Sequence, residues 1–207
     1  MQNHAQNLGN NPWRITESGI DPEHYSLNAT LFALGNGYIG LRGSCEEGLE
    51  GAADQRGCYL NGVYFSEPIS YGEPAYGYAK NNQRIASTAL PHQLGIKLDG
   101  EPMDMSRGQV LEHHRQLQLD NGLLSRSLRW RSQGGQTLTI ESRRLVSLID
   151  RHLVITEYRI TPENFSGSLE ISSSLDATPA KTEASDDPRV GSGINPDDLK
   201  ALESRAD

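Results

Sequence analysis

The 207-residue sequence has little of several features that would mark a specialised class of protein. Only two cysteines are present, Cys45 and Cys58, which are too few for a disulfide framework and lack the close spacing of a zinc site. We therefore expect two reduced thiols in a cytoplasmic protein. The sequence also has no apolar run of about 18 residues and no apolar N-terminal targeting segment, so we expect neither a membrane span nor secretion.

Positive charge is scarce as well. The 19 Lys and Arg residues face 27 Asp and Glu residues, and the formal net charge is −8. Because binding to a phosphate backbone requires a basic patch or stripe, we do not expect a nucleic acid as a partner. The length is still sufficient to bury one large or two small hydrophobic cores.

Glycine is abundant, with 21 residues, whereas only 6% of the residues are aromatic. Glycines spread along a whole chain mark many turns, and many turns imply many short strands. The only segment with a helical period, residues 196–202, is weak. The composition therefore predicts an all-β protein with few short helices.

Alternating apolar and polar residues predict consecutive strands from about residue 92 onward. Three dipeptides that favour tight turns separate several of them: Asp99-Gly100, Asn121-Gly122 and Gly134-Gly135. Short strands joined by short turns pair antiparallel and form a sandwich or a barrel. The predicted strands cover residues 92–98, 109–119, 124–131, 138–142, 145–149, 153–160 and 168–175.

The first ninety residues are less regular. Strands are predicted at 13–15, 31–41 and 58–65, followed by a loop at 66–80 that is rich in Pro, Gly and Tyr. The aromatic side chains of this region, which include Tyr71 and Tyr76, would either stack on sugar rings or cover a sheet edge. We expect a flexible N-terminus at 1–11, a sandwich domain at 12–175 and a polar C-terminal arm at 176–207.

Residues 35–40 satisfy the pattern G-x-G-x-x-G, but no helical period follows them, and a dinucleotide site requires one. A tight glycine-dense loop is the better interpretation, in which the backbone comes close to a ligand or to another strand. Asn36, Tyr38 and Arg42 would supply polar groups there. The sequence alone leaves the choice between ligand and strand open.

Other groups of reactive residues favour ordinary structural roles. The adjacent pair Glu46-Glu47 is expected in an exposed acidic loop, because neighbouring side chains of an extended segment point to opposite sides. His113 and His114 fail as a metal pair for the same reason, and no further ligands occur at metal-binding spacing. We therefore predict no catalytic residue, no metal and no organic cofactor in this chain.

An ordered set of six motifs closely resembles the N-terminal domain of glycoside hydrolase family 65. This family contains maltose, trehalose and kojibiose phosphorylases together with some hydrolases. The resemblance covers about residues 12–190, and one departure is Ala29-Thr30, where the family pattern has Glu-Ser. The motifs are LFALGNGYIGLRG at 31–43, EEG at 46–48, YLNGVY at 59–64, LDGE at 98–101, LDNGLLSR at 119–126 and RRLVS at 143–147.

The resemblance implies a large antiparallel β-sandwich of the supersandwich type, followed in the family by an (α/α)6 barrel that carries the catalytic acid. This chain would then be inactive alone and would serve a parent enzyme that cleaves an α-linked glucosyl disaccharide with inversion. Inorganic phosphate would be the co-substrate and β-glucose 1-phosphate the product. Three alternatives remain: a hydrolase of the same family, a standalone carbohydrate-binding module, and a dimerisation domain that forms a homodimer.

The contribution of the domain itself is a hypothesis about the loop from Gly35 to Glu47. Its glycines and polar groups suggest that it projects toward the mouth of the barrel. There Arg42, together with Tyr38 and Asn36, would contact the sugar acceptor. In the competing interpretation, Arg42 forms an ion pair with Glu46 or Glu47 and only holds the loop.

Overall fold

The computed structural model describes residues 11–47, 57–73 and 75–176. Twelve strands and one short helix lie within this part of the chain. The elements are β1 (Arg14–Ser18), α1 (Tyr25–Leu31), β2 (Leu34–Gly35), β3 (Ile39–Leu41), β4 (Cys58–Pro68), β5 (Asn81–Thr88), β6 (Leu90–Leu98), β7 (Glu101–Pro102), β8 (Gln109–Gln118), β9 (Leu123–Arg131), β10 (Thr137–Val146), β11 (Val154–Pro162) and β12 (Leu169–Asp176).

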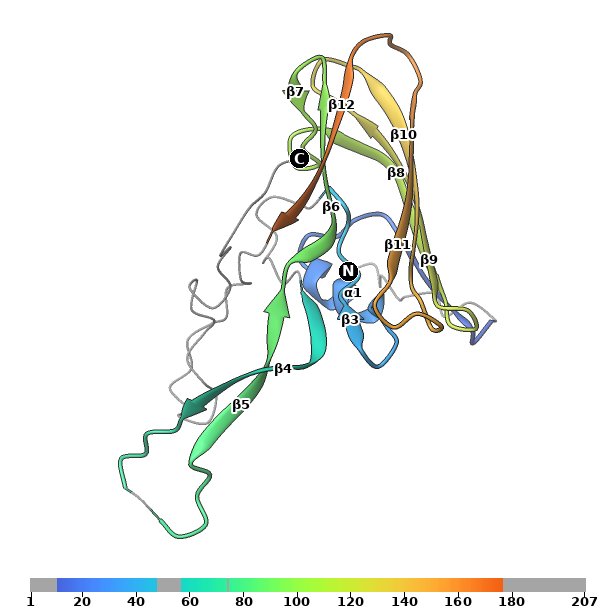
Figure 1. Cartoon of the computed structure of the whole chain (residues 1–207). Coiled ribbons are helices and arrows are strands. Elements are labelled where there is room, and N and C mark those ends of the chain that lie inside the picture. Colours follow the sequence, from blue (N-terminus) through green and yellow to red (C-terminus); the bar gives the residue numbers. More distant parts are fainter. Residues whose placement is uncertain (1–10, 48–56, 74, 177–207) are drawn as a thin grey trace, which may run out of the picture.

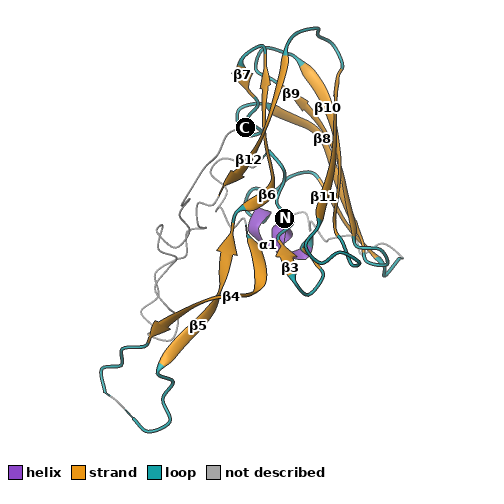
Figure 2. Cartoon of the chain, in the orientation of Figure 1, coloured by secondary structure: helices purple, strands orange, loops and turns teal. Residues whose placement is uncertain are grey.

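The described strands form three antiparallel sheets. The largest has the order β1-β8-β9-β10-β11, and the other two have the orders β12-β6-β7 and β2-β3-β4-β5. In Figure 1 the five-stranded sheet lies opposite β6 and β12, and the β4–β5 hairpin projects away from both. Helix α1 lies among the strands (Figure 2). The all-β antiparallel fold predicted from the sequence is confirmed.

The five-stranded sheet owes its buried face to residue alternation. Along β9, Leu124, Arg126, Leu128 and Trp130 are all buried, whereas the residues between them are more exposed. Leu128, Leu138 and Ile140 are completely buried and share one core cluster with Ile96 and Leu98 of β6. Because side chains two residues apart share a face, this pattern places the core between two layers.

Most of the predicted turns and strand limits are confirmed, but no strand was predicted where β5 (Asn81–Thr88) lies. Asp99 and Gly100 have φ angles of 50° and 86°, as a tight hairpin between β6 and β7 requires. The separate strand expected at 145–149 is wrong, because β10 runs unbroken to Val146. The strand expected at 31–41 is wrong in part: Leu31 ends α1, and a turn at 36–38 divides β2 from β3. The N-terminus at 1–10 and the arm beyond 176, including residues 196–202, lie outside the described residues.

Candidate functional site

After β3 the chain turns into the interior of the sandwich. Gly43, Ser44, Cys45 and Glu46 are all buried. The Gly43 amide donates to the Ala29 carbonyl of α1 at 2.7 Å, and a Cβ atom at Gly43 would lie 2.5 Å from the Phe32 carbonyl oxygen. Only glycine therefore fits where the chain passes the helix.

The carboxylates of Glu46 and Glu47 meet two arginines from the inner face of the five-stranded sheet. Arg126 of β9 pairs with both, at 2.8 Å in each case, and Arg144 of β10 pairs with Glu46. All four side chains are at most 4% exposed, and the Tyr158 hydroxyl donates to Glu47. The predicted exposed acidic loop is thus wrong, because both carboxylates are required to neutralise buried guanidinium groups.

A second buried ion pair lies beside the first. Arg115 of β8 pairs with Glu17 of β1 and also donates to the Gly43 carbonyl at 2.6 Å. Its guanidinium lies 4.2 Å from the centre of the Phe32 ring, and the Asn28 amide donates to Glu17. Together these four ion pairs form what we call the buried charge network: Glu17, Glu46, Glu47, Arg115, Arg126 and Arg144.

The surroundings of Glu46 and Tyr158 shift the pKa values of both groups away from neutral pH. Burial alone would raise the pKa of Glu46, but Arg144 and Arg126 lower it to about 2. Burial together with the charge of Glu47 raises the pKa of Tyr158 far above its ordinary value. A general acid or base needs a pKa near the working pH, so these two shifts favour a structural role for Glu46 and Tyr158.

Two of the predicted site residues meet at the turn between β2 and β3. The Asn36 side-chain oxygen accepts from the amides of Tyr38 and Ile39, at 3.0 and 2.8 Å. Its side-chain nitrogen donates to the carbonyls of Ser147 and Arg151, at 2.7 and 3.2 Å. Asn36 therefore shapes its own turn and ties it to the β10–β11 turn.

Tyr38 completes this turn-to-turn contact. Its ring lies 4.8 Å from the His152 ring in an edge-on arrangement, and the Arg151 guanidinium lies 5.1 Å from its centre. Arg42 has a different neighbour, since it donates to the Ser26 carbonyl of α1 at 2.6 Å. The structure thus brings Asn36 and Tyr38 together and directs Arg42 to the helix, whereas residues 43–46 do not project.

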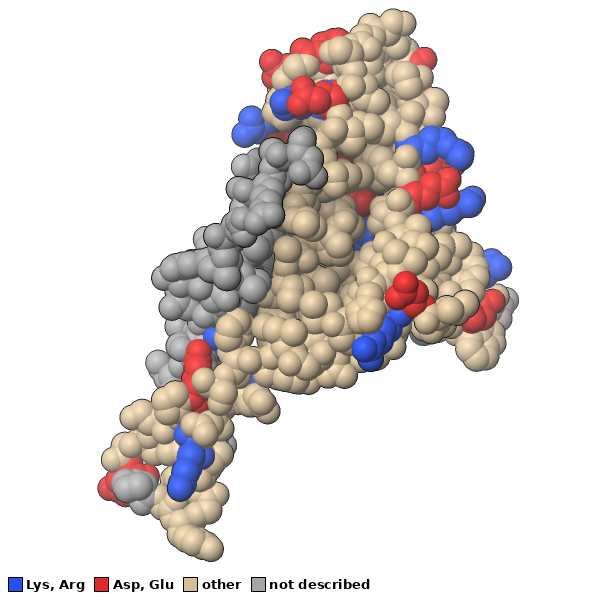
Figure 3. All heavy atoms as spheres, in the orientation of Figure 1, with Lys and Arg blue, Asp and Glu red and all other residues tan. Residues whose placement is uncertain are grey.

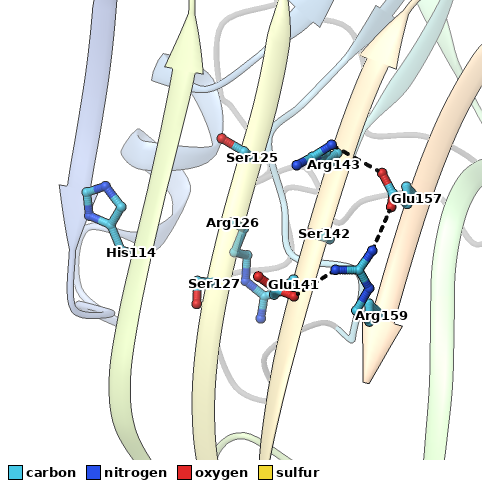
Figure 4. A pocket seen from close by; sticks show the side chains of 9 residues that line it. All are labelled: His114, Ser125, Arg126, Ser127, Glu141, Ser142, Arg143, Glu157 and Arg159. Carbon is cyan, nitrogen blue, oxygen red and sulfur yellow. Dashed lines mark hydrogen bonds and ion pairs between the residues drawn. The ribbon is translucent and has the colours of Figure 1, made fainter. Parts of the chain in front are cut away.

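The solvent face of the five-stranded sheet carries a shallow hollow of about 220 Å³. Figure 4 shows Ser125 and Ser127 with His114 on one side and Arg–Glu pairs on the other. The pairs are Arg143–Glu157 at 3.7 Å, Arg159–Glu141 at 3.3 Å and Arg159–Glu157 at 3.5 Å. On the face of the molecule in Figure 3, acidic and basic side chains likewise lie next to one another. The exposed charged side chains of the hollow, two arginines and two glutamates, therefore neutralise one another.

The paired histidines point to opposite faces of β8, as predicted. His113 is buried, and its Nδ1 lies 2.7 Å from the Gly19 carbonyl, so it donates there; exposed His114 lies 3.2 Å from the Ser18 hydroxyl. Burial and the charge of Arg126 lower the pKa of His113 to about 3. Within the described ranges, no group of His, Cys, Asp and Glu is arranged to hold a metal, and no helix has the length and apolarity to cross a membrane. Both cysteines are buried and unpaired.

The aromatic residues expected near the 66–80 loop lie on the projecting β4–β5 hairpin. The rings of Tyr71 and Tyr78 are 4.8 Å apart, and Tyr64 and Tyr76 are exposed. A two-stranded hairpin is only marginally stable by itself in water, so packing against another surface would stabilise this one. Both alternatives, a sugar platform and a sheet-edge cover, remain predictions.

Comparison with known proteins gives one family. Residues 15–206 match the model described as "Glycosyl hydrolase family 65, N-terminal domain". The chain is 34% identical over 193 residues to an α,α-trehalose phosphorylase of Thermoanaerobacter brockii, which covers 92% of this chain and 25% of that protein. It is 33% identical over 172 residues to a kojibiose phosphorylase of Halothermothrix orenii, with 81% and 20% covered.

A solved structure has the same fold. A protein from the human microbiome, described as a candidate kojibiose phosphorylase, superposes with a TM-score of 0.73 at 22% identity and covers 81% of this chain and 22% of its own. The chain thus spans about a quarter of the length of the relatives that it matches.

Proposed function

Because the chain belongs to glycosyl hydrolase family 65, whose N-terminal domain model matches residues 15–206, we propose that it is the accessory β-sandwich of a disaccharide phosphorylase. The observation that carries this proposal is the similarity to trehalose and kojibiose phosphorylases along more than 80% of the chain. The chain covers about a quarter or less of each of these relatives, which supports an accessory role, with chemistry supplied by a catalytic barrel of the same polypeptide.

The proposed reaction is the phosphorolysis of an α-linked glucosyl disaccharide with inversion. A phosphate oxygen forms a bond to the anomeric carbon while the glycosidic bond breaks, and a carboxylic acid of the barrel protonates the departing oxygen. Since phosphate is already an anion near neutral pH, the enzyme needs no base to activate it. The products are β-glucose 1-phosphate and the released sugar.

Within this reaction we propose that the β-sandwich domain contributes side chains that contact the sugar acceptor. The β2–β3 turn with Asn36 and Tyr38 is held at the surface by the β10–β11 turn, and Arg42 follows β3. Asn36 uses its whole side chain in the turn and therefore acts by positioning Tyr38. Tyr38 and Arg42 would contact the acceptor.

The first test measures the products of the full polypeptide with trehalose, kojibiose or maltose. Phosphate-dependent release of β-glucose 1-phosphate is the expected result. The 207-residue chain by itself should release none. Phosphate-independent release of glucose would instead identify a hydrolase of the same family. Calorimetric titration of the chain with these sugars tests the carbohydrate-binding alternative, and a concentration-dependent mass without sugar binding would indicate a dimerisation domain.

The second test concerns Arg42. In the full polypeptide, Arg42→Ala is expected to raise the KM for the acceptor about five- to tenfold, the effect of about one lost hydrogen bond. Arg107→Ala, which removes an exposed arginine elsewhere, is the matched control. Because Arg42 also donates to the Ser26 carbonyl, Tm is measured alongside. A lowered Tm with unchanged KM and kcat would show that Arg42 only holds the helix.

A further inference from the structure

One end of the five-stranded sheet exposes large apolar side chains. The antiparallel register pairs Arg14 with Gln118 and Arg144 with Leu124, so the start of β1 and the β8–β9 and β10–β11 turns share this end. They lie together at the lower right of Figure 1. Six exposed apolar side chains make up what we call the apolar end: Trp13, Leu119, Leu148, Ile149, Leu153 and Ile155.

The opposite end of the same sheet has a different character. The β9–β10 turn at 132–136 and the β11–β12 connection at 163–168 expose no large apolar side chain. Their polar groups bond to each other instead: the Asn164 amide donates to the Gly135 carbonyl at 2.9 Å, and the Thr137 amide donates to Asn164 at 2.7 Å. This end is suited to water, so the apolar residues at the other end are not a general property of the turns.

A second exposed apolar row lies on β12 but has a simpler explanation. Leu169 and Ile171 stand opposite the buried residues Leu98 and Ile96 of β6 and share their face. This row therefore extends the inner face of the sandwich itself.

Hydrogen bonds fix the β10–β11 turn of the apolar end. The Ser147 hydroxyl accepts from the amides of Ile149 and Asp150, at 3.3 and 3.0 Å, and Asn36 bonds to the carbonyls of Ser147 and Arg151. Leu148 is 74% exposed and Ile149 is fully exposed at the tip, with Asp150 and Arg151 beside them. Apolar residues with polar neighbours on a preorganised turn are the usual anatomy of a binding surface.

We propose that the apolar end is the surface on which the catalytic domain of the same polypeptide docks, an inference that rests on the proposed function. The relatives extend over about four times the length of this chain, so a large neighbouring body is available. Turn tips make a narrow ridge, and two such ridges would bury little area against each other, which disfavours a second copy. A tethered domain can dock through a small surface because the linker supplies a high effective concentration.

The test measures the burial of the apolar end in the full polypeptide. Ile149→Cys places a thiol on the apolar end, and Gln133→Cys places one on the opposite end of the sheet as the matched control. Reaction with a maleimide is followed by peptide mapping, so that thiols elsewhere do not interfere. We expect the thiol at position 149 to react at least about tenfold more slowly than the thiol at position 133, because docking covers it.

Each outcome decides the proposal. Equal reaction rates at the two positions would overturn it, and protection that disappears on dilution would overturn it in favour of a second copy. Protection that is independent of concentration supports docking within the polypeptide. Because phosphorolysis is assayed separately, a protein that is protected but releases no sugar phosphate would contradict the proposed function and leave the docking surface intact.

Discussion

The two faces of the five-stranded sheet carry the same types of charged side chain in opposite surroundings. On the inner face, Arg126 and Arg144 pair with carboxylates, and all of these groups are at most 4% exposed. On the outer face, Arg143 and Arg159 pair with glutamates whose side chains are more than half exposed. Arg143 and Arg144 are adjacent in the sequence, so one step along β10 separates the two environments.

The comparison shows that position on the strand, and not residue type, determines the energetic role of an ion pair. A buried charge that loses its partner is left without solvation, whereas an exposed charge is solvated by water. The inner pairs therefore lock a segment before β4 to two central strands. The outer pairs contribute mainly to solubility.

The largest effect is expected when the inner network is broken. Arg144→Met leaves Glu46 with one of its two arginines, and we expect the free energy of unfolding to fall by about 3–5 kcal/mol. Arg143→Met is the matched control on the adjacent position, with an expected change below about 1 kcal/mol. Urea unfolding measures both. Similar losses for the two variants would break the distinction between the faces.

The adjacent residues His113 and His114 allow the inner and outer faces of the sheet to be compared through the pH dependence of stability. His113 has a pKa of about 3 in the folded protein, so the unfolded chain binds its proton first as the pH falls below about 6.5. The contribution of neutral His113 to the free energy of unfolding is therefore fully present above about pH 6.5. It falls by up to about 1.4 kcal/mol per pH unit as the pH decreases toward about 3.

The measurement is the free energy of unfolding at several values between about pH 6 and pH 4. His113→Asn keeps a donor near the Gly19 carbonyl but does not titrate, so its stability should depend less steeply on pH. His114→Asn, on the solvent face, is the matched control for the loss of an imidazole. An unchanged slope in His113→Asn would refute the assignment. Glu46, with its pKa of about 2, adds a loss below about pH 4.3 in all three proteins.

The smallest effect is expected on the outer face. Arg159→Ala removes two exposed ion pairs, and we expect a loss of about 0.2–1 kcal/mol that shrinks further in high salt. Thermal unfolding at low and high ionic strength measures the change. A salt-independent loss of several kcal/mol would show that the hollow in Figure 4 is more than a solvated face.

Much of the fold could be predicted from the sequence because strand alternation is a local signal. The alternation of Leu124, Leu128 and Trp130 indicates the inner face of β9, and the dipeptide Asp99-Gly100 predicts a hairpin. The same alternation also placed Arg126 on the inner face, which was the available sign of a buried carboxylate partner. The partner lies 80 residues earlier in the chain, and local patterns carry no information about such a pairing.

The candidate site was less accessible to prediction for a related reason. The glycine-dense loop was identified, but its second half enters the core because Gly43 fits against Phe32, a contact that depends on the placement of α1. The partners of Asn36 in the β10–β11 turn lie 111 and 115 residues away. Their role becomes apparent only when the strands are assembled.

The long separations in the buried charge network also constrain how the protein is made. Glu46 leaves the ribosome 80 residues before Arg126 and 98 residues before Arg144. Until β10 has been synthesised, the nascent chain has nowhere to bury that carboxylate, and the segment must stay in water. Native packing of the segment around Glu46 therefore requires that about two thirds of this chain has been synthesised.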